Sequence, residues 1–237
     1  MGITEGSDLI PESQFNGMCK VLVEGERGEV RNQGTGFLFR FETDDGDEIR
    51  GLLTCSQLFQ VHTQADQATP DPAMIFIEFP TNPVTRKRLA GIQKANSIPI
   101  FSHQHEVYFC EVSNEFCQEA ANSNVPFYRE ADGLLDRQVW IAHYPGSSQE
   151  RHVYSAMIDA GWSDTQKFNT HYLSTGAGSS GAPLLQYWAD IHEMRVIGMH
   201  IGAHSTQACN IASSSKHIVR ILKGMRIKPA FYILFLS

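Results

Sequence analysis

The residues best suited to chemistry lie in the segment Gly176–Gly181, which reads GAGSSG. A serine between glycines on a tight turn can project its hydroxyl, so Ser180 is a candidate reactive group. In such a turn the backbone N–H groups of Gly178 and Ser180 converge on one point, where two donors would form an oxyanion hole. The alternative is an ordinary turn rich in glycine and serine, without a reactive group.

Two other motifs fit this segment only in part. It matches G-x-G-x-x-G, but that dinucleotide fingerprint needs a helix after it, and here Pro183 and an apolar strand-like run follow. It is not the nucleophile elbow of α/β-hydrolases, because Ala182 occupies the second glycine position of a G-x-S-x-G centred on Ser180. No nucleotide cofactor is therefore expected.

The chain has ten histidines, which raises the question of a metal site. The closest spacings are His103-x-His105 and His200-x₃-His204, and no Cys-x₂-Cys or His-Glu-x₂-His pattern accompanies them. The acidic stretch Glu42–Glu48 lacks the spacing of an EF-hand loop. We therefore expect no metal and no other cofactor.

The elements that must position these residues are mostly strands, because the apolar residues recur with a period of two. Phe37, Phe39 and Phe41 show this alternation most clearly, and Asp45-Gly46 predicts a hairpin turn after them. Further runs that predict strands are Lys20–Val23, Ile49–Thr54, Ile75–Ile77, Val107–Val112, Val139–His143, Val153–Ile158 and Val196–Ile201.

One late segment predicts a helix. Ser213–Ser215 could cap it, Ile218, Ile221 and Leu222 give it an apolar stripe, and Gly224 could end it. Many short strands with one late helix predict an all-β chain.

The polar segment Ser113–Asp136 has no sustained alternation and is the best candidate linker. It divides the chain into an N-terminal barrel at 12–113, a linker at 114–136, and a C-terminal barrel with the terminal helix at 137–225.

Several blocks resemble the chymotrypsin/trypsin-like serine proteases. GTGFL at 34–38 followed by GLLT at 51–54 is similar to the opening of that family. YPG at 144–146, GSSGAPL at 178–184 and VIGMH at 196–200 are similar to its second barrel, and the order and spacing agree over roughly residues 15–225. The resemblance implies two six-stranded antiparallel β-barrels with a substrate cleft between them. It makes Ser180 the nucleophile and Gly178 with Ser180 the oxyanion hole, and the disulfide-poor character is similar to the intracellular, HtrA-like branch.

The family's catalytic triad is altered at two positions. Gln57 stands where the family has its basic histidine, separated from Leu53-Thr54 by two residues. A serine hydroxyl needs a neighbouring general base, and an amide has no usable proton affinity near neutral pH. Glu106 stands at the acid position, usually aspartate, where it could orient an imidazole, but none is present at position 57. His62 and His105 are the candidate substitute bases.

The family's pattern also implies a pocket for the P1 side chain. Its floor falls at Ser174, and one wall is formed by Met199, His200, Ile201 and Gly202. No acidic residue stands at the floor, so a basic P1 side chain would lose its charge partner on desolvation. His200 could donate to an uncharged or acidic side chain. We expect apolar or neutral polar P1 groups and no preference for Lys or Arg.

Composition narrows the function classes. The 237 residues are 42% hydrophobic and 19% charged, which excludes a disordered chain, and the net charge of −7 does not favour a nucleic-acid partner. No apolar run reaches the roughly 18–20 residues of a membrane span, and the N-terminus lacks the pattern of a signal peptide. Five cysteines without paired spacing predict free thiols. We expect a cytoplasmic or nuclear protein with no nucleic-acid and no membrane partner.

The function predicted from these residues is that of a trypsin-like serine peptidase homologue whose proteolysis is lost or strongly reduced. Its inter-barrel cleft would bind a peptide or protein ligand. The main alternative is an active serine endopeptidase that uses Ser180 with His62 or His105 as the base. A third hypothesis, an interaction module without a cleft, is disfavoured because the block from Gly178 to Gly181 is intact. The sequence leaves the oligomeric state open.

Overall fold

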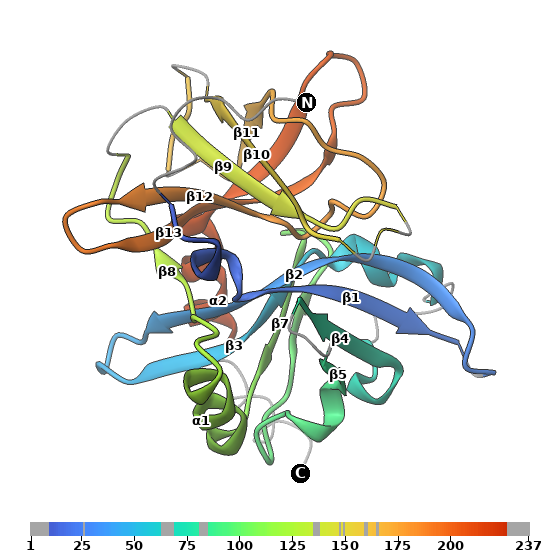
Figure 1. Cartoon of the computed structure of the whole chain (residues 1–237). Coiled ribbons are helices and arrows are strands. Elements are labelled where there is room, and N and C mark those ends of the chain that lie inside the picture. Colours follow the sequence, from blue (N-terminus) through green and yellow to red (C-terminus); the bar gives the residue numbers. More distant parts are fainter. Residues whose placement is uncertain are drawn as a thin grey trace, which may run out of the picture.

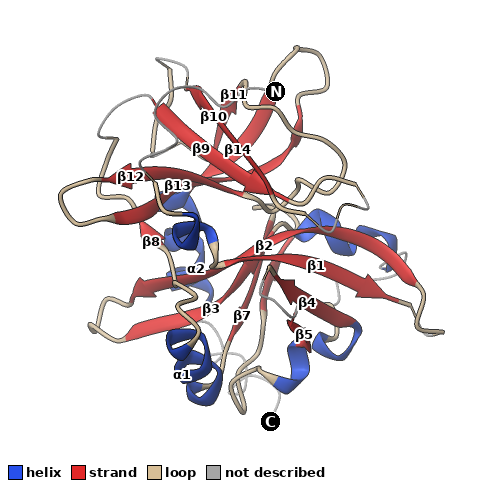
Figure 2. Ribbon diagram, in the orientation of Figure 1, coloured by secondary structure: helices blue, strands red, loops and turns tan. Residues whose placement is uncertain are grey.

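The structure is a computed structural model. It describes residues 10–25, 27–62, 69–80, 85–134, 138–146, 148, 150–158, 161–164 and 166–226. The chain forms two β-sheets, one from each half of the sequence, which meet along a common side (Figure 1). Strands make up most of both halves, and short helices lie around them (Figure 2).

The first half folds into a seven-stranded antiparallel sheet with the order β5-β4-β1-β2-β3-β7-β6. Its strands are β1 (Met18–Glu24), β2 (Val30–Glu42), β3 (Glu48–Thr54), β4 (Ile75–Phe79), β5 (Thr85–Arg88), β6 (Ile100–Ser102) and β7 (Val107–Glu111). Four 3₁₀ turns interrupt them, η2 (Glu12–Phe15), η3 (Ser56–His62), η4 (Pro72–Met74) and η5 (Leu89–Gly91). The hairpin predicted at Asp45-Gly46 is confirmed, with Gly46 at φ +86° between β2 and β3.

The second half forms a sheet with the order β10-β9-β12-β13-β14-β11. Its strands are β9 (Gln138–His143), β10 (His152–Met157), β11 (Phe168–His171), β12 (Pro183–Trp188), β13 (Glu193–Ala203) and β14 (Asn210–Ser214). A seventh strand, β8 (Arg129–Glu130), pairs with β13 in parallel. The two predicted β units and the C-terminal helix are therefore confirmed, although each sheet has seven described strands instead of six.

Two helices differ from the expectation. The C-terminal helix α2 (Ser215–Arg226) runs through Gly224, which does not end it. An interior glycine costs only about 1 kcal/mol relative to alanine, and the burial of Ile218, Val219 and Leu222 outweighs that cost. Within the polar linker lies an unpredicted helix, α1 (Asn114–Asn122), which is capped where the Phe116 N–H donates to Ser113 Oγ at 3.2 Å.

The core that joins the halves draws on both sheets and on α2. This shared core includes Phe37, Phe39 and Phe41 of β2 and Met199 and Ile201 of β13. Leu38 points to the other face of β2, into a cluster confined to the first half and α1. A third cluster fills the second half around Ile141, Leu184 and Ile197. The period-two pattern of β2 thus places one face between the halves and the other inside its own half.

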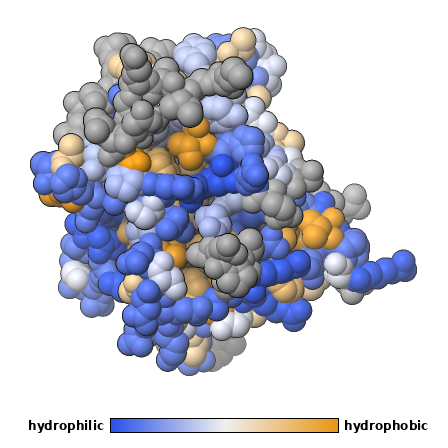
Figure 3. All heavy atoms as spheres, viewed as in Figure 1, coloured by the Kyte–Doolittle hydropathy of each residue, from blue (hydrophilic) through white to orange (hydrophobic). Residues whose placement is uncertain are grey.

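The surface in the same view is mostly hydrophilic, with apolar atoms in small separate patches (Figure 3). No helix among the described residues is long and apolar enough to cross a membrane.

Candidate active site

The turn that carries Ser180 can be made only by glycines at two positions. Gly178 has φ +88° and Gly181 has φ +89°, in the left-handed region that favours glycine. A Cβ atom on Gly178 would lie 2.5 Å from the carbonyl oxygen of Tyr144, and one on Gly181 would lie 2.1 Å from that of Thr35. The positive φ angles and these close approaches of the backbone explain why positions 178 and 181 are glycines.

Thr35 of β2 holds this turn against the first half of the chain. Its N–H donates to the carbonyl of Ser180 at 3.0 Å, and its hydroxyl donates to the carbonyl of Gly178 at 2.9 Å. The same hydroxyl accepts the N–H of Tyr144 at 3.1 Å. Thr35 lies in the GTGFL block, but the block gave no signal that its side chain would fix the turn.

The predicted oxyanion hole has its donors available. Among the described residues, the amides of Gly178 and Ser180 donate no hydrogen bond, whereas the intervening Ser179 N–H donates to the Gly176 carbonyl at 3.0 Å. Two neighbouring amides without an acceptor in a polar turn are suited to a carbonyl or an oxyanion.

The hydroxyl of Ser180 donates to the backbone carbonyl of Ile201, with an Oγ–O distance of 2.9 Å. A peptide carbonyl accepts a hydrogen bond but does not take up a proton near neutral pH. The hydroxyl is therefore bound to a group that cannot serve as a general base.

Gln57 lies at the start of η3, directly after β3, and reaches the same part of β13. Its Oε1 is 3.8 Å from the position that a Cβ atom on Gly202 would take, next to Ile201. The side chain of Gln57 and the hydroxyl of Ser180 therefore meet neighbouring residues of one strand.

Glu106 lies beside the segment that precedes Gln57. Its carboxylate accepts the hydroxyl of Ser56 at 3.0 Å and the thiol of Cys55 at 3.8 Å. Glu106 has φ +57°, which is uncommon for a residue other than glycine and requires support from its surroundings. The structure thus places the acid position next to the segment that carries the base position.

No protein-family model and no curated protein matches this sequence. Solved structures do match. A serine endoprotease from Yersinia pestis has a TM-score of 0.59 at 12% identity over 90% of this chain, which spans 64% of the length of that endoprotease chain. The active form of the Rv3671c protease from M. tuberculosis gives 0.53 at 12% identity, over 87% of this chain and 79% of the other. A Glu endopeptidase gives 0.53 at 12% identity, over 90% and 92%. The chain has the trypsin-like serine protease fold.

Within this trypsin-like fold, one of the two candidate substitute bases is otherwise engaged. His105 Nδ1 lies 3.2 Å from Nε2 of His217 on α2, and the two ring centroids are 5.3 Å apart. The His105 ring therefore joins the turn before β7 to the C-terminal helix. The side chain of His62 lies outside the described residues.

The predicted pocket residues divide between two faces of β13. Met199 and Ile201 point into the shared core, so only their backbone can line a pocket. His200, between them, points the other way, and Gly202 follows the strand's bulge. Ser174 lies exposed in the loop between β11 and β12. The histidine spacings considered for a metal do not assemble, because His103 packs on Phe101 while His204 contacts Thr206.

His200 pairs with a second histidine, His171, and no sequence pattern predicts this contact. His171 Nε2 on β11 lies 3.1 Å from His200 Nδ1, and both rings are buried. Burial lowers the pKa of His200 to about 3 and that of His171 to about 4, so both rings are neutral at physiological pH. The other nitrogen of His171, Nδ1, is buried without a partner.

The unpartnered Nδ1 of His171 determines which ring donates in the hydrogen bond between His171 and His200. An unpaired N–H costs more than an unpaired lone pair, so His171 keeps its proton on Nε2 and donates to His200 Nδ1. His200 then carries its own proton on Nε2, where it can be offered as a donor.

A third buried histidine, His143 on β9, supports the Ser180 turn through Ser179. Ser179 Oγ accepts the N–H of Gly176 at 2.9 Å and lies 2.5 Å from His143 Nδ1 on β9. Burial lowers the pKa of His143 to about 4, and its other nitrogen, Nε2, is buried without a partner, so the neutral ring keeps its proton on Nδ1 and donates it to Ser179 Oγ. The loop before Ser180 is therefore fastened to β9 by a side-chain bond that the sequence did not suggest.

All five cysteines are free and buried, which confirms the predicted free thiols. Cys55 is fully buried, and burial raises the pKa of its thiol far above the usual value. It lies beside the base position as a small apolar residue and not as a nucleophile.

Proposed function

We propose that this chain is a trypsin-like serine peptidase homologue whose proteolytic activity is lost or strongly reduced and whose cleft binds a peptide. One observation carries the proposal. The hydroxyl of Ser180 donates to the Ile201 carbonyl, and the nearby base position holds Gln57. Neither group can take the proton that a serine nucleophile must lose.

The size of the expected loss follows from triads in which single members have been removed. Losing the histidine costs about 10⁶-fold in turnover and leaves roughly 10³-fold over water, from the oxyanion hole and binding. A residual activity of that size does not sustain a protease, but the features that produce it are the ones that bind a peptide carbonyl.

Peptide binding is supported by the groups that the missing base does not affect. The amides of Gly178 and Ser180 remain free to donate, and the positive-φ glycines hold them in place. A peptide carbonyl placed against them would accept two hydrogen bonds at no cost in rearrangement. The ligand we propose is therefore a peptide or an exposed loop of a protein.

The preferred P1 side chain follows from His200. A neutral imidazole with its proton on Nε2 is a donor, so it suits an amide or carboxyl oxygen better than a cation. We propose neutral polar or apolar P1 residues and no preference for Lys or Arg. Capture of Lys- or Arg-terminated peptides from a displayed library, in preference to Gln-terminated ones, would contradict this.

The five free thiols also support a reducing compartment, so we propose a cytoplasmic or nuclear location. Relationship to the HtrA-like branch is a proposal on the same basis. Fractionation of cells that express the chain, with oxidation state read by thiol alkylation, tests the location. Recovery of a disulfide-bonded form would contradict it.

The test of the main proposal is a fluorophosphonate probe, which labels serines that a base activates. We expect labelling of the native chain to stay at the level of Ser180→Ala and of the control Ser174→Ala, which removes an exposed serine nearby. Stoichiometric labelling that disappears in Ser180→Ala but persists in Ser174→Ala would show an activated nucleophile. The alternative of an active endopeptidase would then replace our proposal.

A further inference from the structure

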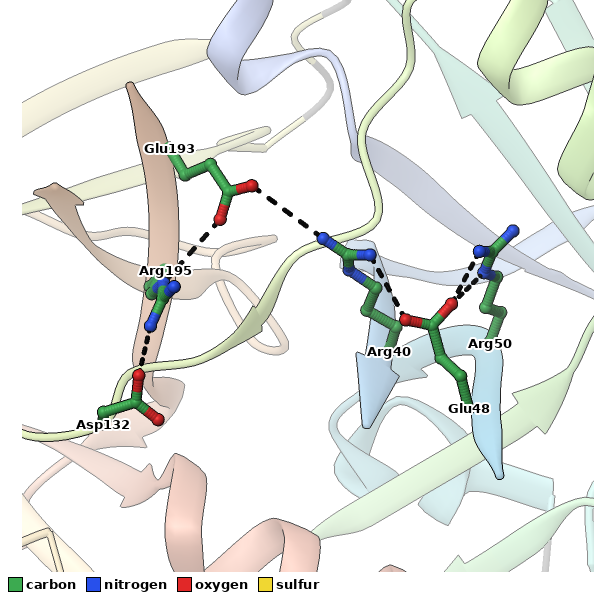
Figure 4. Close-up of polar contacts among 6 residues, drawn as sticks. All are labelled: Arg40, Glu48, Arg50, Asp132, Glu193 and Arg195. Carbon is green, nitrogen blue, oxygen red and sulfur yellow. Dashed lines mark hydrogen bonds and ion pairs between the residues drawn. The ribbon is translucent and has the colours of Figure 1, made fainter. Parts of the chain in front are cut away.

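An ion-pair network joins the two halves at the linker, away from Ser180 (Figure 4). Glu48 of β3 bridges Arg40 of β2, at 3.2 Å, and Arg50 of its own strand, at 2.6 Å. Across the junction, Glu193 of β13 lies 4.0 Å from Arg40 and 3.7 Å from Arg195.

Asp132 of the linker completes the network by pairing with Arg195. The six side chains in Figure 4 are therefore three arginines and three carboxylates, and their charges cancel. No carboxylate of this network is left for a further cation.

Arg129 is a further cation at this junction, in addition to the three arginines of the network. It lies on β8, where its backbone is in register with Arg195, a second arginine. In the part of the chain that the structure describes, the Arg129 side chain has no hydrogen bond and no ion pair. Arg129 therefore has no direct anionic partner, although the carboxylates of Glu42 and Glu130 line a neighbouring cavity that it also reaches.

A cavity of about 250 Å³ opens beside Arg129, and we call it the linker pocket. It shares no residue with the candidate active site, and its walls come from both halves and from the linker. The residues used below are Arg40, Arg50, Pro126, Phe127, Arg129 and Met194. Its volume is close to the lower end of small-molecule sites, which usually measure about 300–1,000 Å³.

The charged residues that line the linker pocket are three arginines, Arg40, Arg50 and Arg129, and one carboxylate, Glu193. Nε of Arg40 is buried and has no hydrogen-bond partner. Arg129 adds a guanidinium with the geometry that binds a carboxylate through two hydrogen bonds.

The remaining walls are mixed, with Gln14 and Glu193 as polar residues and an apolar side around Phe127. Phe127 lies under the guanidinium of Arg50 at 5.8 Å, and Pro126 and Met194 line the pocket beside it. A ligand that fills this space must present a small apolar body together with its acceptor.

We propose that the linker pocket binds a carboxylate carried on a small apolar or aromatic group. Of the three arginines that line the pocket, Arg40 and Arg50 are already paired with Glu48, so one guanidinium, that of Arg129, is left for one carboxylate. A polyanion is disfavoured because a neighbouring cavity that also reaches Arg129 is lined by Glu42, Asp44, Glu130 and Asp132. The net charge of −7 acts in the same direction.

The experiment uses the full chain, with phenylacetate as the probe and thermal unfolding and calorimetry as the measurements. We expect phenylacetate to bind saturably and raise Tm, and its neutral counterpart phenylacetamide and inorganic phosphate to bind at least tenfold more weakly. Equal effects of phenylacetate and phenylacetamide, or no saturable binding of phenylacetate, would overturn the proposal.

Two variants separate this pocket from general charge effects. Arg129→Gln should weaken phenylacetate binding at least tenfold and, since Arg129 has no partner to lose, should leave the Tm of the free protein nearly unchanged. The matched control is Arg88→Gln, which removes an exposed arginine of β5 that stacks on Phe76 outside the pocket. Unchanged affinity in Arg129→Gln, or equal weakening in both variants, would overturn the proposal.

If Arg129→Gln fails to fold, the native chain still gives an answer through methyl NMR. Phenylacetate in the linker pocket should shift the methyl resonance of Met194 and leave that of Met157, which is exposed on β10, unmoved. Shifts at Met157 alone would place the ligand elsewhere.

A peptide C-terminus presents the same chemistry as a free acid, and a further arm distinguishes the two. A tripeptide that ends in Phe with a free carboxylate is compared with its C-terminal amide. Binding of phenylacetate alone identifies a free acid as the ligand. Tighter binding of the tripeptide, lost in its amide, identifies a chain terminus.

Discussion

The two sides of the candidate active site differ in what holds them together. On the second-half side, the Ser180 turn is built from backbone groups, with glycines at φ +88° and +89° and with the amides of Gly178 and Ser180 lacking an acceptor among the described residues. On the first-half side, the predicted base and acid positions depend on side-chain chemistry, and they hold Gln57 and Glu106. The Ser180 turn can therefore persist when the side chains that transfer protons are replaced, because the fold itself requires the glycines of the turn.

The largest effect should come from repairing the first-half side. Gln57→His places an imidazole between Ser180 and Glu106, and with Glu106→Asp it should raise hydrolysis of activated esters by about 10²–10⁴-fold, the usual contribution of a general base. Gln57→His alone should gain less, because the longer carboxylate displaces the ring and an error of about 1 Å can cost 10²-fold. Ester turnover under saturating and single-turnover conditions measures this.

Two controls accompany that repair. Glu106→Asp alone should change nothing, and Ser180→Ala in the double variant should abolish the gain, because triad members act as a unit. If the native chain already hydrolyses esters through Ser180 and Gln57→His leaves the rate unchanged, a different base is present.

The next largest effect should come from damaging the second-half side. Gly181→Ala combines a left-handed backbone, worth about 1–3 kcal/mol, with a backbone clash, so we expect a loss of at least about 3 kcal/mol in the free energy of unfolding. Gly46→Ala is the matched control, because Gly46 has φ +86° but nothing within 4 Å of its Cβ position. It should lose only about 1 kcal/mol in urea unfolding. Equal losses would mean that the close approach to Thr35 does not constrain the turn.

The smallest effect concerns the buried histidines of the second half. The unfolded chain takes up protons on histidine below about pH 6.5, whereas His200 in the folded chain has a pKa of about 3. The unfolded state therefore binds more protons as the pH falls, and stability declines from about pH 6.5 downwards by about 1 kcal/mol per pH unit for this residue.

Chemical unfolding at several pH values measures that slope. His200→Gln should make it shallower between about pH 6 and 4, because His171 and His143 still contribute, whereas the control His204→Gln, from the loop after β13, should keep it. A slope that is the same in the native chain and in His200→Gln would show that His200 is protonated in the folded state.

Much of this molecule could be predicted from the sequence because the signals are local. Alternation along Phe37–Phe41 and the Asp45-Gly46 turn predict strands and a hairpin, and the Gly178–Gly181 block predicts a turn with two donors. Helix α1 was not predictable from its pattern, since it buries only Phe116, Cys117 and Ala120 within a polar segment.

The contacts that were missed join residues far apart in the chain. His171 and His200 are separated by 29 positions and come together because β14 places β11 and β13 on its two sides. Arg40 and Glu193 meet only where the two halves dock. Such pairs depend on strand order and docking, which no short stretch of sequence specifies.

Thr35 makes the shape of the Ser180 turn a joint property of both halves. Its backbone and hydroxyl belong to β2, yet they bind Ser180, Gly178 and Tyr144 of the other sheet. The oxyanion donors are therefore correctly aimed only while the halves stay docked, and a chain divided at the linker would present the same Gly-Ser-Ser-Gly letters without the site. In this fold the Ser180 turn takes its shape only when the two separately patterned sheets are docked against each other.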